Sequence, residues 1–139
     1  DSVTSYCWIH HDYPGTFPTA EYGPWMEKSA SLWPEFVKRW AVPYYPNVSM
    51  GWDPSPRTTQ TDEYKHHGYP FTSVVVGNTP EAFGEALRRA RDFLDKQPED
   101  RRILTINAWN EWTEGSYLEP DTVHGMAYLE ALKAVFGDK

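Results

Sequence analysis

Short strand-like segments alternate with helix-like segments along this chain, and this alternation restricts the fold more than any other feature. The clearest helix covers residues 80–94, where Thr79 suits the N-cap, Pro80 suits the first position and apolar residues recur at helical spacing. Four segments rich in β-forming residues are candidate strands, at residues 2–9, 47–52, 71–76 and 103–106, although 71–76 could equally be an extended connection. Such alternation predicts an α/β fold with parallel strands.

Two more helices are predicted from apolar residues at helical spacing, over residues 25–40 and 125–136. Pro34 interrupts the first of them, so we expect this helix to be kinked or split into two short helices. Residues rich in Gly, Pro and polar side chains predict loops or connectors at 10–24, 42–46 and 53–67.

The length of the chain limits how complete the fold can be. Its 139 residues can form one modest core, but they are little more than half of the roughly 250 residues of a complete (β/α)8 barrel. The chain could be half of such a barrel or a small open α/β domain. Half a barrel alone would expose two sheet edges and an apolar inner face. We therefore expect a missing N-terminal half, a partner chain or a swapped homodimer.

Charge and composition argue against several classes of function. The net charge is −7, and because phosphate binding needs a basic face, we expect no nucleic-acid partner. No run is long enough to span a membrane, and no GxGxxG or P-loop indicates a nucleotide cofactor. We recognise no signal peptide, but the chain starts at Asp1 rather than Met, which indicates a processed or truncated product. Cytoplasmic and exported locations therefore both stay open.

Two pairs of adjacent histidines raise the question of a metal site: His10 with His11, and His66 with His67. Adjacent side chains on a strand point to opposite faces, so neither pair is well placed to chelate one ion. No HExxH or Cys/His spacing accompanies them. We expect surface or loop histidines and no metal, although His10 or His11 could line a cleft.

The segment after the predicted strand at 103–106 contains the strongest candidates for chemistry. Glu111 and Glu114 lie three residues apart, close to aromatic residues. Parallel α/β folds bind ligands beyond the carboxyl ends of their strands. Paired carboxylates beside aromatic rings are what a sugar-cleaving site requires, so we predict that both acids are catalytic. The alternative is two solvated acids on a loop.

Four amide and aromatic side chains close to the acids are candidates for binding sugar: Asn107, Trp109, Asn110 and Trp112. The two asparagines could instead hold Glu111 in place. Glu119 could contact a sugar hydroxyl or serve as a structural anchor. We expect Asp121 to cap the final helix.

Three further candidates for substrate binding follow the predicted strand at 47–52: Trp52, Asp53 and Arg57. Trp52 and Trp8 could form a wall on which a sugar stacks, although Trp8 could as well belong to the core. Asp53 and Arg57 could contact the ligand or brace the loop through an internal salt bridge.

Two of these segments resemble a known family. Asn110-Glu-Trp-Thr-Glu-Gly115 resembles the Asn-Glu-Trp-His-Glu-Gly stretch of glycoside hydrolase family 99, with Thr113 in place of the His. Residues 116–121 are more similar to the WbsX-like (family 99-like) proteins of bacterial polysaccharide gene clusters. Residues 50–57 resemble the Gly-Trp-Asp-x-x-Pro-Arg segment of that branch. The resemblance extends over the whole chain and corresponds to the C-terminal half of the family's barrel.

The resemblance implies a partial (β/α)8 (TIM) barrel, in which residues 1–139 are a C-terminal half with parallel strands. It also implies that Glu111 is a general base for the sugar 2-hydroxyl and Glu114 a general acid for the leaving oxygen. Trp52 stands where family 99 has Tyr, so a phenolic hydrogen bond near the base is expected to be lost.

The function that follows is a retaining glycoside hydrolase, of bacterial type, that cleaves a polysaccharide or oligosaccharide. Two alternatives stay open: a glycosyltransferase of bacterial polysaccharide biosynthesis and a non-catalytic carbohydrate-binding domain. The isolated chain could also be an inactive fragment, because a cleft built from eight loops loses half its walls when four are absent.

Overall fold

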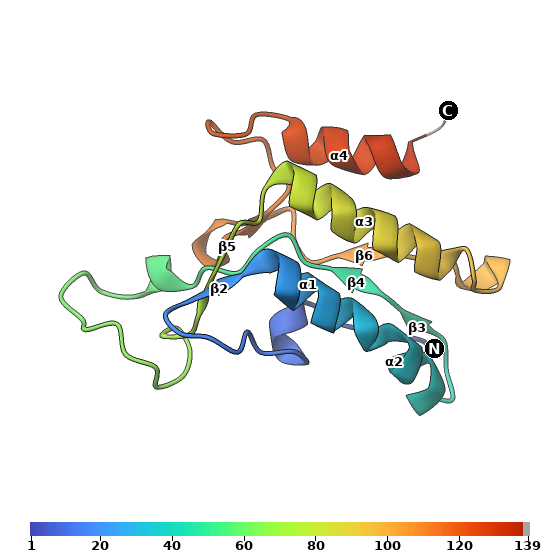
Figure 1. The fold of residues 1–139 in the computed structure, drawn as a ribbon, viewed down its shortest axis with the longest axis horizontal. Coiled ribbons are helices and arrows are strands. Elements are labelled where there is room, and N and C mark those ends of the chain that lie inside the picture. Colours follow the sequence, from blue (N-terminus) through green and yellow to red (C-terminus); the bar gives the residue numbers. More distant parts are fainter. Residues whose placement is uncertain (138–139) are drawn as a thin grey trace.

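The computed structural model describes residues 1–137 and has a mixed α/β architecture (Figure 1). Its helices are α1 (Tyr22–Ser31), α2 (Trp33–Arg39), α3 (Pro80–Leu94) and α4 (Ala127–Phe136). Its strands are β1 (Val3–Thr4), β2 (Thr19–Glu21), β3 (Tyr44–Tyr45), β4 (Asn47–Val48), β5 (Val74–Val76), β6 (Thr105–Ile106), β7 (Asn110–Glu111) and β8 (Ser116–Tyr117). Short 3-10 turns occur at Trp8–His10, Ser55–Arg57, Glu99–Arg101 and Trp112–Glu114.

Parallel ladders join strands that are distant in the sequence. β1 pairs with β3, β4 pairs with β6, and β2 pairs with β5. Only Pro46 separates β3 from β4, and the Pro46 carbonyl accepts a hydrogen bond from the Thr105 amide of β6 at 3.0 Å. Strands β1, β3–β4 and β6 therefore lie side by side in chain order, each ending at the same edge. An α/β fold with parallel strands is confirmed.

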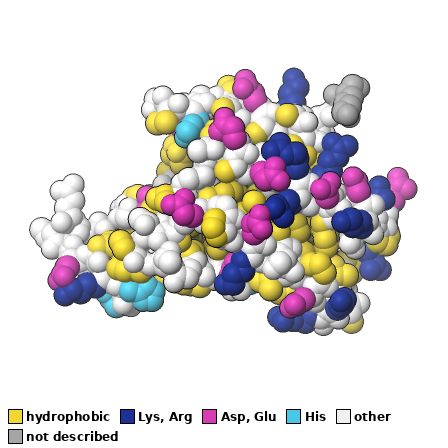
Figure 2. Space-filling view, viewed as in Figure 1, with side chains coloured by type: hydrophobic (Ala, Val, Ile, Leu, Met, Phe, Trp, Pro, Cys, Tyr) yellow, Lys and Arg dark blue, Asp and Glu magenta, His cyan; other side chains and the backbone are white. Residues whose placement is uncertain are grey.

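Helices cover one face of these strands. Helix α3 contacts α1 on one side, α4 on the other, and β4 beneath (Figure 1). The core between the helices and the strands contains large buried side chains, among them Trp8, Tyr22, Val48, Met50, Phe83 and Leu87. Acidic and basic side chains are interspersed over the helical face, without a continuous basic patch (Figure 2).

The other face of the strands is polar where we expected it to be apolar. Thr4 Oγ1 of β1 and Thr105 Oγ1 of β6 are 2.9 Å apart, and Asn47 Nδ2 of β4 donates to Thr105 Oγ1 at 3.2 Å. Since β1 and β6 lie on opposite sides of β3–β4, their side chains can touch only if the sheet curves strongly. In (β/α)8 barrels, inward side chains of alternate strands meet in this way. Residues 1–137 form no closed barrel, and a partial barrel stays a prediction.

The helices agree well with the sequence pattern. The helix at 80–94 is confirmed as α3, and the Thr79 hydroxyl accepts a hydrogen bond from the Ala82 amide at 3.3 Å, as expected of an N-cap. The predicted split of the helix at 25–40 is also confirmed, with α1 ending at Ser31 and α2 starting at Trp33. However, α1 begins at Tyr22, within the segment predicted to be a loop.

The strands are shorter than predicted and some were missed. The predicted loop at 10–24 also contains β2, and the predicted connector at 42–46 contains β3, which pairs with β1. The strand expected at 71–76 is present as β5, but it pairs with β2, outside the series β1, β3–β4 and β6. Strands β2 and β3 were missed because they are only three and two residues long, too short to show a pattern of alternation. No helix among the described residues has the length and apolar character needed to cross a membrane.

Candidate active site

The two glutamates lie in a hairpin that follows β6. Strands β7 and β8 pair antiparallel, and the 3-10 turn Trp112–Glu114 connects them. The hairpin packs against the backbone that leaves β4: the Asp53 amide donates to the Glu114 carbonyl at 2.7 Å, and Ser116 Oγ donates to the Gly51 carbonyl at 2.6 Å. The structure therefore places the acids beyond the carboxyl ends of β4 and β6, the edge at which parallel α/β folds bind ligands.

Both carboxylates meet at one guanidinium group. Arg57 Nη2 lies 2.8 Å from Glu111 Oε1 and 3.6 Å from Glu114 Oε1. The sum of these distances limits the separation of the two Oε1 atoms to at most about 6.4 Å. The Arg57 and Glu111 side chains are 38% and 34% exposed and that of Glu114 is 13% exposed, so the cluster opens to solvent. The predicted Asp53–Arg57 salt bridge is not among the ion pairs of residues 1–137.

Thr113 links the arginine to one of the acids. Its hydroxyl accepts a hydrogen bond from Arg57 Nε at 3.0 Å and donates one to Glu111 Oε1 at 3.0 Å. Glu111 therefore receives two donors, a guanidinium and a hydroxyl, at the same carboxylate oxygen. The residue that replaces the family 99 His is thus part of the cluster.

Tyr69 is a member of the cluster that the sequence did not reveal. Its hydroxyl donates to Glu114 Oε1 at 2.9 Å, and its ring centroid lies 6.3 Å from that of Trp52. Residues 58–70 show no periodic pattern, so nothing local indicates that this loop returns to an acid 45 positions further along the chain. Desolvation and the hydrogen bond and charge of Glu114 raise the pKa of Tyr69, so its hydroxyl remains protonated.

Tyr6 is a second tyrosine near the acids that was not predicted. Partial desolvation, followed by the negative charges of Glu114 and Glu111, raises the pKa of the Tyr6 hydroxyl. Its side chain is exposed, so it adds to the aromatic surface around the cluster. It lies in the segment predicted to be the first strand, where alternation suggested only a structural role.

The two predicted tryptophans beside the acids are exposed, Trp109 by 52% and Trp112 by 42%. The Trp112 ring stacks on Tyr117, with centroids 3.8 Å apart, and its Nε1 donates to Glu119 Oε2 at 2.9 Å. Glu119 therefore anchors Trp112, one of the two roles that the sequence left open. The outer faces of both indoles are open to a ligand.

The two asparagines differ in their surroundings. Asn107 is buried, and its Oδ1 accepts a hydrogen bond from the Met50 amide at 3.3 Å, which ties the end of β6 to the end of β4. Asn110 is exposed on β7, opposite Tyr117. Within residues 1–137 neither side chain is hydrogen-bonded to Glu111.

The two tryptophans around β4 are buried, whereas Asp53 is only partly buried, like the glutamates. Trp52 is 5% exposed and donates through Nε1 to Thr72 Oγ1 at 3.0 Å. Trp8 is fully buried in the core, which was the alternative to a sugar-stacking wall. Asp53 Oδ1 accepts from the Ser55 amide at 3.0 Å, so this carboxylate shapes the loop that presents Arg57.

Asp121 does not cap the final helix, contrary to prediction. Helix α4 begins at Ala127, whereas Asp121 Oδ1 accepts hydrogen bonds from the backbone amides of Val123 and His124 in the preceding turn. These two hydrogen bonds, with that from His124 the stronger influence, lower the pKa of Asp121. The prediction failed because a turn separates the capping residue from the helix.

The two histidine pairs differ in their surroundings. Residues 1–137 contain no group of three His, Cys, Asp or Glu side chains placed to hold a metal ion. His66 lies in the loop after β4, where its Nε2 is 3.1 Å from the Tyr13 hydroxyl. His11 differs from the predicted surface histidine, because both of its ring nitrogens are buried and its ring packs edge-on against Phe36. This burial lowers the pKa of His11.

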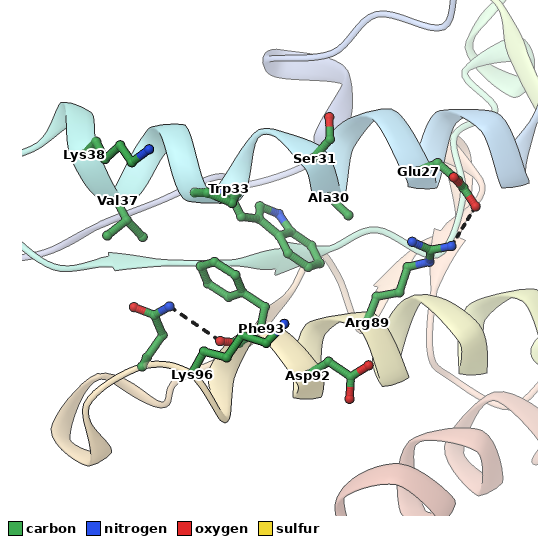
Figure 3. A pocket seen from close by; sticks show the side chains of 12 residues that line it. Glu27, Ala30, Ser31, Trp33, Val37, Lys38, Arg89, Asp92, Phe93 and Lys96 are labelled. Atoms are coloured by element: carbon green, nitrogen blue, oxygen red, sulfur yellow. Dashed lines mark hydrogen bonds and ion pairs between the residues drawn. The ribbon is translucent and has the colours of Figure 1, made fainter.

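A groove of about 680 Å³ lies away from the acids, between α1–α2 and α3. Trp33 and Phe93 line it and pack against each other, with ring centroids 5.4 Å apart (Figure 3). The Glu27–Arg89 ion pair lies at one end of the groove (Figure 3). Neither Glu111 nor Glu114 lines this groove. The acid cluster lies elsewhere and is partly exposed to solvent.

Lysine is not expected to reproduce the hydrogen bonds that Arg57 makes in this cluster. Desolvation lowers the pKa of Arg57, but the hydrogen bond to Glu111 and the charge of Glu114 together outweigh it, so the pKa is raised and the guanidinium stays charged. An ammonium group cannot donate to Glu111 and Thr113 from two fixed positions. We predict that Arg57→Lys loosens this cluster and lowers kcat/KM roughly tenfold.

The matched control for this substitution is Arg39→Lys, because the Arg39 guanidinium lies over the Phe36 ring, 5.4 Å from its centroid, on α2. Arg39→Lys should leave kcat/KM unchanged. Equal kinetics for the two variants would contradict a role for Arg57 in holding the acids.

The chain is similar to a known protein family and to two bacterial proteins. Residues 19–132 match the family described as "Glycosyltransferase WbsX". Two similar relatives are described as "Uncharacterized protein WxcX" and come from Xanthomonas campestris pv. campestris, strains B100 and ATCC 33913. Each is 35% identical over 97 residues, which cover 64% of this chain but only 12% of the relative. No solved structure matches the chain. The chain therefore belongs to the WbsX family of carbohydrate-active enzymes.

Proposed function

We propose that this chain carries the acid–base pair of a retaining glycoside hydrolase that cleaves a polysaccharide or oligosaccharide. The observation that supports it most directly is the convergence of Glu111 and Glu114 on Arg57, at the carboxyl ends of two parallel strands. Membership of a carbohydrate-active family supplies the substrate class. The family name describes a transferase, so hydrolysis is the part that needs testing.

In the first proposed step, the Glu111 carboxylate accepts the proton of the sugar 2-hydroxyl while that oxygen attacks C1. The bond between C1 and the leaving oxygen breaks, and Glu114 gives its proton to that oxygen. The product is a 1,2-anhydro sugar, with Glu111 protonated and Glu114 ionised. The roles are carried over from the family 99 resemblance, in which the first Glu of the motif is the base and the second is the acid.

In the second proposed step, the Glu114 carboxylate accepts a proton from water as the water oxygen attacks C1. The three-membered ring opens, and Glu111 returns its proton to the 2-oxygen. Both glutamates are then in their starting states, and two inversions at C1 give overall retention. The limit of about 6.4 Å between the Oε1 atoms supports this course, because both carboxylates can then reach one sugar ring.

The predicted substrate-binding residues divide into two groups in this proposal. Trp109 and Trp112 have exposed ring faces on which a pyranose can stack, and Asn110 is exposed beside them. The second group has a structural role. Asn107, Trp52 and Asp53 are hydrogen-bonded within the protein, and Glu119 holds Trp112. Arg57 is common to both groups, since it binds the acids and is partly exposed.

The remaining wall of the site is proposed to come from outside these residues, from an N-terminal half of the barrel, a partner chain or a second copy. The curvature that brings Thr4 to Thr105 supports a barrel wall. The open position of the acid cluster is also consistent with a cleft that further loops complete.

A direct test measures reducing ends released when the native protein is incubated with bacterial polysaccharides and a panel of aryl glycosides. The proposal expects catalytic release without any added nucleotide. No release from any of them would contradict it.

The alternative function is that of a glycosyltransferase, because the description of the family names that activity. A transferase needs an activated sugar donor, so a nucleoside diphosphate should raise the melting temperature of the native protein. We expect no such shift, because Arg57 is already paired with two carboxylates and Glu119 adds a third acid nearby. A reproducible shift without hydrolysis would favour the transferase, whereas sugar binding with no turnover would favour a binding domain.

A further inference from the structure

Tyr69 holds Glu114 in a way that separates the two oxygens of its carboxyl group. The tyrosine hydroxyl and Arg57 both approach Oε1, at 2.9 and 3.6 Å. Within the described residues, no hydrogen bond or ion pair involves Glu114 Oε2. One oxygen is thus fixed by the protein and the other is available to a ligand.

The Tyr69 ring has supports that do not depend on its hydroxyl. It lies against Trp52, with centroids 6.3 Å apart, and the Arg57 guanidinium lies 5.9 Å from its centroid. The loop is anchored separately, because the Tyr64 hydroxyl donates to the Thr72 carbonyl at 2.7 Å. Removing only the Tyr69 hydroxyl should therefore leave the ring and the loop in place.

Because its pKa is raised by desolvation and by Glu114, the Tyr69 hydroxyl remains a donor at neutral and mildly alkaline pH. A donor fixed on Oε1 restricts rotation of the carboxyl group. The proton that leaves the group must then be carried on Oε2.

We propose that Tyr69 is a positioning residue that fixes Glu114 through Oε1 and directs the proton on Oε2 toward the leaving oxygen. This inference rests on the proposed function, in which Glu114 is the general acid. It assigns to the loop between β4 and β5 a part in leaving-group protonation, a role that neither the family match nor the motif indicates. The step itself is unchanged: the O–H bond of Glu114 breaks as the leaving oxygen gains its proton.

The test uses the dependence of rate on the leaving group, because a good leaving group needs no proton. The native protein and Tyr69→Phe are compared on the 2,4-dinitrophenyl and phenyl glycosides of a pyranose that the native protein cleaves. We expect Tyr69→Phe to lower kcat for the phenyl glycoside by roughly 10–100-fold and for the dinitrophenyl glycoside by less than about threefold.

Two further variants make the outcome decisive. Tyr64→Phe removes a hydroxyl that only anchors the loop, so it should affect both substrates equally. Glu114→Gln removes the acid itself and should show an even larger selective loss on the phenyl glycoside. Equal losses for Tyr69→Phe on the two substrates, or none, would overturn the inference while leaving Glu114 as the acid. Loss without selectivity in Glu114→Gln would instead overturn the proposed function, and the inference with it.

Discussion

Replacing Glu111 or Glu114 by glutamine is expected to lower kcat for glycan cleavage by about 10²–10⁴-fold, the usual worth of a general acid or base. Glutamine has the same shape as glutamate, so the side chain should still accept from Arg57, and Glu114→Gln should still accept from Tyr69. Glutamine cannot, however, take or give the reacting proton. The loss should therefore appear in kcat without loss of folded protein, as measured by steady-state kinetics and circular dichroism.

The matched control is Glu130→Gln, which changes an exposed glutamate on α4. It should retain the kinetics of the native protein. Native turnover in both Glu111→Gln and Glu114→Gln would show that the pair is not catalytic, and what remained would be a fold and a family without chemistry.

The second large effect is expected at Gly115, directly after the proposed acid. Its φ of +60° is in the left-handed region, and a Cβ there would lie 2.8 Å from Asp53 Cβ. Gly115→Ala should therefore cost about 1–2 kcal/mol in backbone strain and about 1–3 kcal/mol more from the overlap. Because the hairpin must shift away from Asp53, Glu114 should move with it and activity should fall.

Gly125→Ala measures the first contribution, the backbone strain, without the overlap. Gly125 has a φ of +56°, but a Cβ there would have nothing within 4 Å, so only the strain should appear. Urea denaturation of both variants gives the comparison. If the two substitutions lowered the free energy of unfolding equally, the close packing of the acid hairpin against the backbone after β4 would be wrong.

Local patterns in the sequence predicted those parts of the site that are close together in the chain. Helix α3 could be predicted because its cap and its apolar stripe lie within 16 residues, and α1–α2 because Pro34 interrupts a regular pattern. The position of Glu111 and Glu114 beyond β6 followed from the short apolar run that precedes them. Each of these features is decided by neighbours in sequence.

Contacts between distant segments could not be predicted in the same way. Arg57 was a candidate ligand or a partner for Asp53, but the folded chain brings it to two glutamates more than 50 positions away. No sequence pattern indicated that Tyr69 belongs to the site, because a loop can fold back to a distant site without any periodic spacing of its residues. Asp121 lies five residues before Met126, the N-cap of α4, because a turn separates it from the helix. These contacts depend on how the loops after β4 and β6 meet.

Retaining cleavage by Glu111 and Glu114 is tested by the anomeric configuration of the first product. This configuration is followed by proton NMR while the native protein cleaves a glycoside. The proposed mechanism, with both glutamates held on one guanidinium, inverts C1 twice and so predicts that the product first appears with the anomeric configuration of the substrate. A first product of inverted configuration would rule out the proposed mechanism with two inversions at C1.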